Sequence, residues 1–164
     1  MVGLMGAGKS CIGRRLAARL DLPFKDADAE IEAAAGCSVS EIFSRFGEAG
    51  FRDGERKVIA RLLDEPPIVL ALGGGAFIDP ETRDRLRRRA VTVWLRADLD
   101  LLVKRTAGRD HRPLLKQGDA RDILKKLMEQ RYPVYAEADV VVDSRDEAPE
   151  VTVEAVIAAL GAHP

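Results

Sequence analysis

The sequence contains few cysteines and histidines and no asparagine. The two cysteines, Cys11 and Cys37, are too few for a disulfide framework, and His111 and His163 do not have the spacing of a zinc site. Without asparagine there is no glycosylation sequon, and there is no NKxD motif with which a regulatory GTPase reads its base. Disulfide-rich domains, zinc modules and GTPase switches are therefore excluded.

The sequence also lacks long apolar runs and an excess of charge of one sign. Its 26 basic residues nearly balance 27 acidic ones, so the chain as a whole does not attract nucleic acid or an anionic membrane surface. No apolar run approaches the roughly 18 residues that a membrane span requires, and the first residues show no signal-peptide pattern. We expect a cytoplasmic monomer whose partners are small molecules, with no nucleic-acid or membrane partner.

Short apolar runs rich in branched residues alternate with helical patterns along the chain. The runs cover 68–72, 91–95 and 140–142, and the helical patterns cover 11–20, 55–63, 123–131 and 151–160. This alternation is typical of parallel βαβ units. With 164 residues and 46% hydrophobic content, the chain is predicted to form a single doubly wound α/β domain over 1–164.

Near its start the chain carries a phosphate-binding motif. Residues 3–10, GLMGAGKS, fit the pattern GxxxxGKS, and a helical pattern follows at once. The glycines let the backbone curl with its N–H groups inward, while the helix N-terminus adds positive potential. Lys9 supplies a cation for the β- and γ-phosphates, and Ser10 supplies a hydroxyl for Mg²⁺. The predicted nucleotide-binding residues are Met5, Gly6, Ala7, Gly8, Lys9 and Ser10.

A strand is expected before this loop, but only Met1 and Val2 precede Gly3. A P-loop normally follows a buried strand of about five apolar residues. Either the chain is truncated at its start or the central strand is stunted. We expect a first strand that is marginal at best, with a penalty in stability.

The segment PFKDADAEIE delivers Asp26 and Asp28 two residues apart. In an extended backbone alternate side chains point the same way, so both carboxylates can face one cleft. One would then serve Mg²⁺ and the other a substrate hydroxyl. A helix cap or a solvated turn is an equally weighted interpretation of this pair.

Six motifs in order, GLMGAGKS, DAD, FRDGE, LGGG, RPLL and RYPVY, resemble the shikimate kinase family over nearly the whole chain. The resemblance implies a P-loop kinase fold with a parallel five-stranded sheet in the order 2-3-1-4-5. It also implies a helical substrate-binding region at about 29–62 and a lid at about 106–119. The implied reaction moves the γ-phosphate of ATP, with Mg²⁺, to the 3-hydroxyl of shikimate.

The resemblance further implies roles for individual side chains. Asp28 would hold the shikimate hydroxyls and act as base on the attacking one, and Asp26 would reach Mg²⁺. Arg52 and Arg131 would bind the shikimate carboxylate, which suits the bidentate geometry of guanidinium groups. Glu55, three residues beyond Arg52, is close enough on a helix to orient it.

Glycines and two more arginines complete the implied site. Gly73, Gly74 and Gly75 would bring backbone N–H groups against the substrate without a side chain in the way. Arg112 would fold over the phosphates as a catalytic lid arginine and stabilise charge in the transition state. Arg105 would lie near the adenine.

Other interpretations stay open. A gluconate-type or nucleotide kinase would keep the P-loop and the lid but replace the carboxylate-binding arginines, Arg52 and Arg131. An inactive nucleotide-binding module would result if the short start disabled the loop. A protein kinase is disfavoured because HRD and DFG motifs are absent. Shikimate kinase is the function that we predict.

Overall fold

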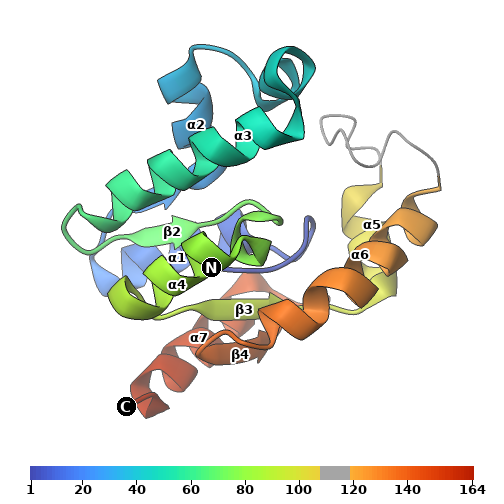
Figure 1. Ribbon diagram of the computed structural model, residues 1–164. Coiled ribbons are helices and arrows are strands. Elements are labelled where there is room, and N and C mark those ends of the chain that lie inside the picture. The colour runs from blue at the N-terminus through green and yellow to red at the C-terminus, as the bar shows by residue number, and fades with distance from the viewer. Residues whose placement is uncertain (108–118) are drawn as a thin grey trace.

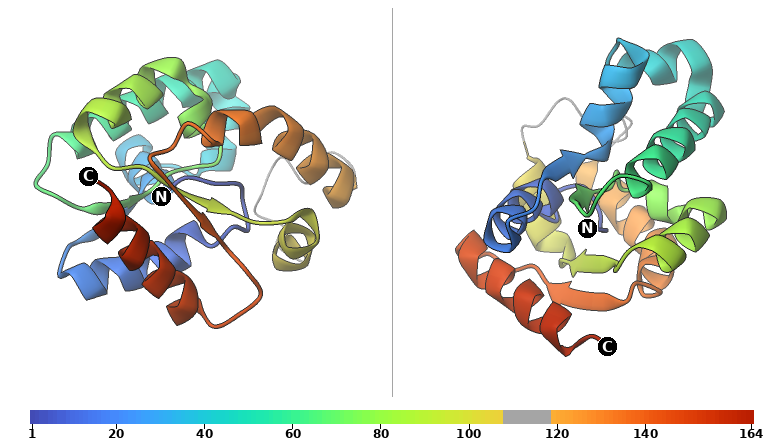
Figure 2. Two further views of the ribbon diagram at one scale, coloured as in Figure 1. Left: turned by 90° about the horizontal axis from the view of Figure 1, so that it is seen from below. Right: turned by 90° about the vertical axis from the view of Figure 1, so that its left-hand side faces the viewer.

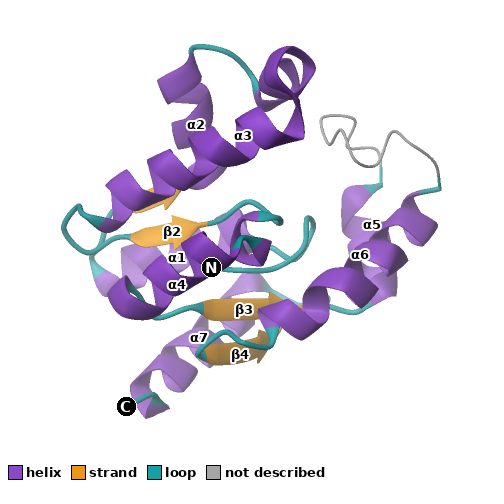
Figure 3. Ribbon diagram, viewed as in Figure 1, coloured by secondary structure: helices purple, strands orange, loops and turns teal. Residues whose placement is uncertain are grey.

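Short parallel strands form the middle layer of the structure (Figure 3). The structure is a computed structural model, and it describes residues 1–107 and 119–164. Within these residues the strands are β1 (Phe24–Asp26), β2 (Val69–Ala71), β3 (Val93–Arg96) and β4 (Val140–Asp143). β1 pairs in parallel with β2, and β3 pairs in parallel with β4. The parallel βαβ organisation expected from the sequence is therefore present.

The first residues of the chain lie between these two strand pairs. The Leu72 N–H donates to the Met1 carbonyl at 3.0 Å, on the β2 side. On the other side the Val2 N–H donates to the Val93 carbonyl at 2.8 Å, and the Leu95 N–H donates to the Val2 carbonyl at 2.9 Å. Val2 forms a single isolated bridge with β3 and is only 2% exposed. In place of a full strand before the loop, the structure has this one buried bridge.

Helices cover both faces of the strand layer. They are α1 (Lys9–Leu20), α2 (Ala27–Ala35), α3 (Val39–Leu63), α4 (Pro80–Arg89), α5 (Leu99–Thr106), α6 (Ala120–Tyr135) and α7 (Pro149–Ala162), with the short 3₁₀ helix η1 (Ala76–Ile78). Helices α1 and α7 lie on one face and α4 and α6 on the other (Figure 2, left). Helices α2 and α3 pack on each other and extend away from the strands (Figure 1). No helix within the described ranges is long and apolar enough to cross a membrane.

Helix ends follow the local sequence. Ser38 caps α3 by accepting the Glu41 N–H at 3.1 Å, and Asp79 caps α4 with Pro80 in its first turn. Helix α3 begins well before the predicted 55–63 pattern and bends at Gly47, whose φ is 70°. The start of α3 falls within the helical region expected at about 29–62, and because the bend interrupts the apolar periodicity, the 55–63 pattern marks only the later part of the helix.

Two clusters of buried side chains hold these layers together. The larger one lies between the strands and their covering helices, and it includes Leu4, Leu95, Leu102 and Leu124, each fully buried. Each such side chain contributes about 1.5–3 kcal/mol relative to exposure. The smaller cluster joins α2 to α3 through Ile31, Ile42, Phe51, Val58 and Leu62. This second cluster fixes α3, which carries Arg52, relative to α2, which carries Asp28.

Candidate active site

The P-loop runs from the Val2 bridge into α1. Gly6 and Gly8 have φ values of 86° and 98°, a region that favours glycine, and Gly8 is the N-cap of α1. The Lys9 ammonium group folds back over the loop and donates to the Gly3 carbonyl at 2.6 Å and the Leu4 carbonyl at 3.1 Å. The loop therefore has the curled backbone, the helix N-terminus and the cation that phosphate binding requires.

Arg105 and Ser144 hold the P-loop through its backbone carbonyls. Arg105 Nη1 donates to the carbonyls of Gly6 and Ala7, both at 3.2 Å, and to Ser144 Oγ at 2.9 Å. Ser144 Oγ in turn donates to the Ala7 carbonyl at 2.8 Å. In a trans peptide the Gly8 N–H points opposite to that carbonyl, away from Ser144 and Arg105. No motif marked Ser144, which is buried and lies far along the chain from the loop that it supports.

The two predicted magnesium ligands contact each other. Ser10 Oγ donates to Asp26 Oδ2 at 2.6 Å. Among the described residues, no group of three or more His, Cys, Asp and Glu side chains is placed to hold a metal. Mg²⁺ is usually bound through one or two carboxylates together with substrate phosphates, so a hydroxyl and a carboxylate beside a phosphate loop fit this ion.

The prediction that Asp26 and Asp28 share one extended segment is wrong. Strand β1 ends at Asp26, and Asp28 lies in the first turn of α2. Asp26 Oδ1 accepts the N–H groups of Asp28 at 3.0 Å and Ala29 at 3.2 Å, so the cap interpretation of the motif applies. The reason is that a capping carboxylate stabilises a helix start where alanines and glutamate follow.

Asp28 nevertheless faces the predicted site. A Cβ atom placed on Gly73 would lie 2.9 Å from Asp28 Oδ1. Burial raises the pKa of the Asp28 carboxyl, and the negative charge of Asp26 raises it further, while Lys9 and Arg52 act in the opposite direction. The charges that act on this carboxyl come from the P-loop lysine, Lys9, and from Arg52 on α3.

Arg52 is oriented by a buried carboxylate, as the helical spacing predicted. Its Nη1 atom donates to Glu55 Oε1 at 2.7 Å, and Glu55 is 1% exposed. Burial raises the pKa of Glu55, and the charge of Arg52 opposes that shift. The guanidinium group also lies 5.2 Å from the ring centroid of Phe51, within the range of a cation–π contact.

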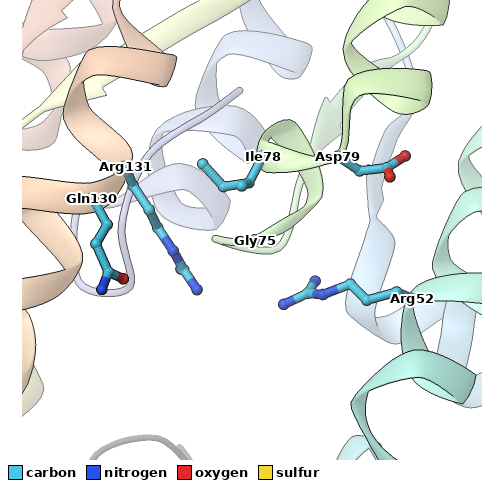
Figure 4. Close-up of a pocket in the computed structure, with 6 residues that line it drawn as sticks. All are labelled: Arg52, Gly75, Ile78, Asp79, Gln130 and Arg131. Carbon is cyan, nitrogen blue, oxygen red and sulfur yellow. The ribbon is translucent and has the colours of Figure 1, made fainter.

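Arg52 and Arg131 face each other across one pocket (Figure 4). The cavity has a volume of about 270 Å³ and is lined by Arg52, Gly75, Ile78, Asp79, Gln130 and Arg131. Arg52 extends into it from α3 and Arg131 from α6, so their guanidinium groups approach from opposite sides (Figure 4). Such a pair of cations across a small cavity suits a small carboxylate-bearing molecule.

The three glycines after β2 provide space for these charged groups. None of them has a positive φ, so backbone freedom is not what requires glycine there. A Cβ on Gly75 would lie 2.2 Å from Arg52 Nη2, and one on Gly74 would lie 3.1 Å from Arg131 Nη1. The sequence predicted the absence of side chains here, but not that the neighbouring arginines need the space.

Two predicted features fall outside the described residues. Arg112 is one of them, and the other is most of the lid expected at 106–119. Among the predicted site residues within the described ranges, the P-loop, Asp26 and Asp28 form one group, and Arg52, Arg131 and the glycines form the other. Asp28 and Gly73 join the two groups.

Comparison with known proteins gives a consistent result. The family model described as shikimate kinase matches residues 5–161. A shikimate kinase of Paramagnetospirillum magneticum is 69% identical over 160 residues, which is 98% of this chain and 82% of that protein. The structure of a shikimate kinase from Acinetobacter baumannii in complex with shikimate has a TM-score of 0.95 at 34% identity, covering 98% of this chain and 90% of that one.

A gluconokinase from Sinorhizobium meliloti is a more distant structural relative. Its TM-score is 0.63 at 20% identity, covering 98% of this chain and 90% of that one. At this identity the likeness shows a shared fold alone.

Proposed function

The chain belongs to the shikimate kinase family, and we propose that it transfers the γ-phosphate of ATP to the 3-hydroxyl of shikimate through the residues gathered around the arginine pocket. One observation carries the assignment of residues: the guanidinium groups of Arg52 and Arg131 face each other across a cavity of about 270 Å³. A cavity of this size and charge fits a small ring that carries a carboxylate.

Shikimate docks with its carboxylate between these two arginines. Each guanidinium offers paired donors to the two oxygens, and Glu55 keeps Arg52 from turning away by accepting its Nη1–H at 2.7 Å. A gluconate-type substrate is also a carboxylate, but it is an open chain. The rigid ring of shikimate lets one anchored end set the position of the hydroxyls at the other end, near Asp28.

The P-loop residues from Met5 to Ser10 hold the triphosphate of ATP. Backbone N–H groups and the Lys9 ammonium neutralise the phosphates, and Arg105 lies on the side of the loop toward residues 144–145, where it donates to the Arg145 carbonyl at 2.7 Å. Ser10 and Asp26 hold Mg²⁺, which supplies positive charge to the phosphate oxygens when bound. Their mutual hydrogen bond of 2.6 Å keeps both oxygens directed to one place.

Asp28 accepts the proton of the attacking hydroxyl. Its pKa is raised by burial and by Asp26, which makes it a stronger base than an exposed aspartate. Lys9 and Arg112 stabilise the charge that develops on the transferring group. Most of the acceleration then comes from positioning and from charge neutralisation, as is usual in phosphoryl transfer.

We extend the proposal to the architecture. Counting residues 1–4 as the first strand gives the sheet order 2-3-1-4-5, and the hydrogen bonds of Met1 and Val2 to both neighbouring strands support this order. All strands and helices then belong to one domain that acts as a monomer. The region 29–62 forms the substrate side, and the lid expected at 106–119 falls mostly outside the described residues.

A coupled assay of ADP release tests the proposal. ADP should appear with ATP, Mg²⁺ and shikimate, and it should not appear above background with shikimate omitted or replaced by gluconate. Arg131→Ala should raise the KM for shikimate by roughly 10- to 100-fold, because a charge-assisted contact is lost.

Arg89→Ala provides the matched control, since Arg89 is an exposed arginine that pairs with Asp64. That variant should behave as the wild type. An unaltered KM in Arg131→Ala would refute the docking assignment, and release driven equally by gluconate would refute the choice of substrate.

A further inference from the structure

Tyr135 carries a completely buried phenol. It ends α6, lies one helical turn after Arg131 and is 0% exposed. A buried hydroxyl needs a hydrogen-bond partner, because leaving it unpaired costs free energy. The Tyr135 hydroxyl finds this partner in another part of the chain, where it donates to the carbonyl of Gly74.

Arg131 and Tyr135 meet at the same backbone position. A Cβ atom on Gly74 would lie 3.1 Å from Arg131 Nη1 and 3.8 Å from the Tyr135 hydroxyl oxygen. Residues four apart on a helix share a face, so the two side chains reach this point side by side. Gly74 thus lies against two groups. One is the neutral phenol of Tyr135, and the other is the guanidinium of Arg131, which lines the pocket.

The ring of Tyr135 is held firmly. Its centroid lies 5.9 Å from that of Trp94, 6.1 Å from that of Tyr132 and 6.5 Å from that of Phe77. Burial raises the pKa of Tyr135 to about 12, against the charge and hydrogen bond of Arg131, which lower it. The hydroxyl therefore stays protonated at working pH, and it serves as a fixed neutral anchor rather than as an acid or a base.

We infer that Tyr135 is a positioning residue, whose hydroxyl holds the Gly74 backbone and the Arg131 guanidinium together so that Arg131 faces Arg52 across the pocket. This inference rests on the proposed function, because the position of Arg131 matters only if it binds the substrate carboxylate. The arginine side chain is flexible, and a neighbouring group that is itself fixed by packing and by a hydrogen bond limits the conformations that the arginine adopts.

The same helix supplies a matched control. Tyr132 also has a partly buried phenol on α6, and its hydroxyl donates to the Ala97 carbonyl at 2.5 Å. Tyr132→Phe and Tyr135→Phe each remove one oxygen and one hydrogen bond to a carbonyl, and both keep the aromatic ring. They differ in that Tyr135 also contacts Arg131.

We expect Tyr135→Phe to raise the KM for shikimate by roughly tenfold, with kcat and the KM for ATP within about twofold of wild type. Tyr132→Phe should leave all three constants unchanged. Thermal unfolding of both variants measures the purely structural cost, which should be similar. An equal shikimate KM in the two variants would overturn the inference, and so would a parallel change in kcat and both KM values.

A double-mutant cycle tests whether Tyr135 acts through Arg131. In an Arg131→Ala background, Tyr135→Phe should add no further change in the KM for shikimate. If it still raised that KM tenfold, Tyr135 would act independently and the inference would be wrong.

A crystal structure of unliganded Tyr135→Phe decides the same point without any assay. Arg131 should no longer face Arg52, and an unmoved Arg131 would refute the inference. If the wild type released no ADP with shikimate, the proposed function would be wrong. The comparison of the two crystal structures would still show whether Tyr135 determines the position of Arg131.

Discussion

Ser10 and Asp26 meet through a hydrogen bond of 2.6 Å between the hydroxyl that ends the P-loop and the carboxylate that caps α2. The two oxygens of Asp26 have different partners. Oδ2 accepts the hydrogen bond from Ser10, and Oδ1 accepts the backbone N–H groups at the start of α2. One side chain therefore links the nucleotide loop to the helix that carries Asp28.

Asp26→Ala should remove the cap of α2 and one of the two proposed Mg²⁺ ligands at once. Loss of the cap should cost about 1 kcal/mol, which lowers the Tm by about 2–4 °C, and the Mg²⁺ concentration for half-maximal rate should rise. Ser38→Ala removes the cap of α3 without touching the P-loop, so it should lower the Tm similarly and leave the Mg²⁺ requirement unchanged. The same Mg²⁺ requirement in both variants would contradict a metal role for Asp26.

Asp28→Asn should abolish phosphoryl transfer and stabilise the protein at neutral pH. The pKa of Asp28 is raised in the folded state, so the folded protein holds its proton more tightly than the unfolded chain does. The buried charge of Asp28 therefore lowers the free energy of unfolding by its full amount above the pKa that Asp28 has in the folded protein. It has no such effect below the pKa that Asp28 has in the unfolded chain. Removing the charge should raise the Tm at pH 8, by about 2–4 °C per kcal/mol relieved, and the gain should vanish at acidic pH.

Asp53→Asn is the control for this stability effect. Asp53 is exposed, and its pKa is lowered by a hydrogen bond and by the charge of Lys57, so its loss should not raise the Tm. For the wild type, kcat/KM should fall as pH drops through the raised pKa of Asp28, above the ordinary aspartate range. An acid limb at the ordinary value, or a Tm gain in Asp53→Asn alone, would count against the assigned environment.

Gly75→Ala should fold but displace Arg52. The new Cβ would lie 2.2 Å from Arg52 Nη2, and because that atom is the end of a flexible side chain, the arginine moves rather than the backbone. We expect the KM for shikimate to rise by roughly tenfold or more. Gly54→Ala on α3 meets nothing within 4 Å, and it should add up to about 1 kcal/mol of helix stability with no change in KM. Steady-state kinetics and thermal unfolding of the pair separate the two effects.

Ser144→Ala should weaken nucleotide binding without affecting shikimate. The variant loses the hydrogen bond to the Ala7 carbonyl and the oxygen that accepts from Arg105, so the P-loop is held less firmly. We expect the KM for ATP to rise by roughly threefold to tenfold. Ser144→Thr, which keeps the hydroxyl, should recover part of the loss. A change in the KM for shikimate of the same size would show that the effect is a general loss of structure.

The sequence by itself determined the features that depend on neighbouring residues. The P-loop, the alternation of apolar runs with helices, the caps at Ser38 and Asp79 and the Arg52–Glu55 pair all involve positions within a few residues of each other. Local backbone geometry and side-chain reach are enough to specify such features. The order of the motifs indicated the shikimate kinase family, and this resemblance implied the list of site residues.

Only the tertiary structure decided how distant segments meet. It set Arg131 opposite Arg52, and it placed Tyr135 and Ser144 as supports for groups far away in the chain. These relations depend on the packing of whole helices against the strand layer and on clearances of a few ångströms, and no local pattern of residues encodes either one.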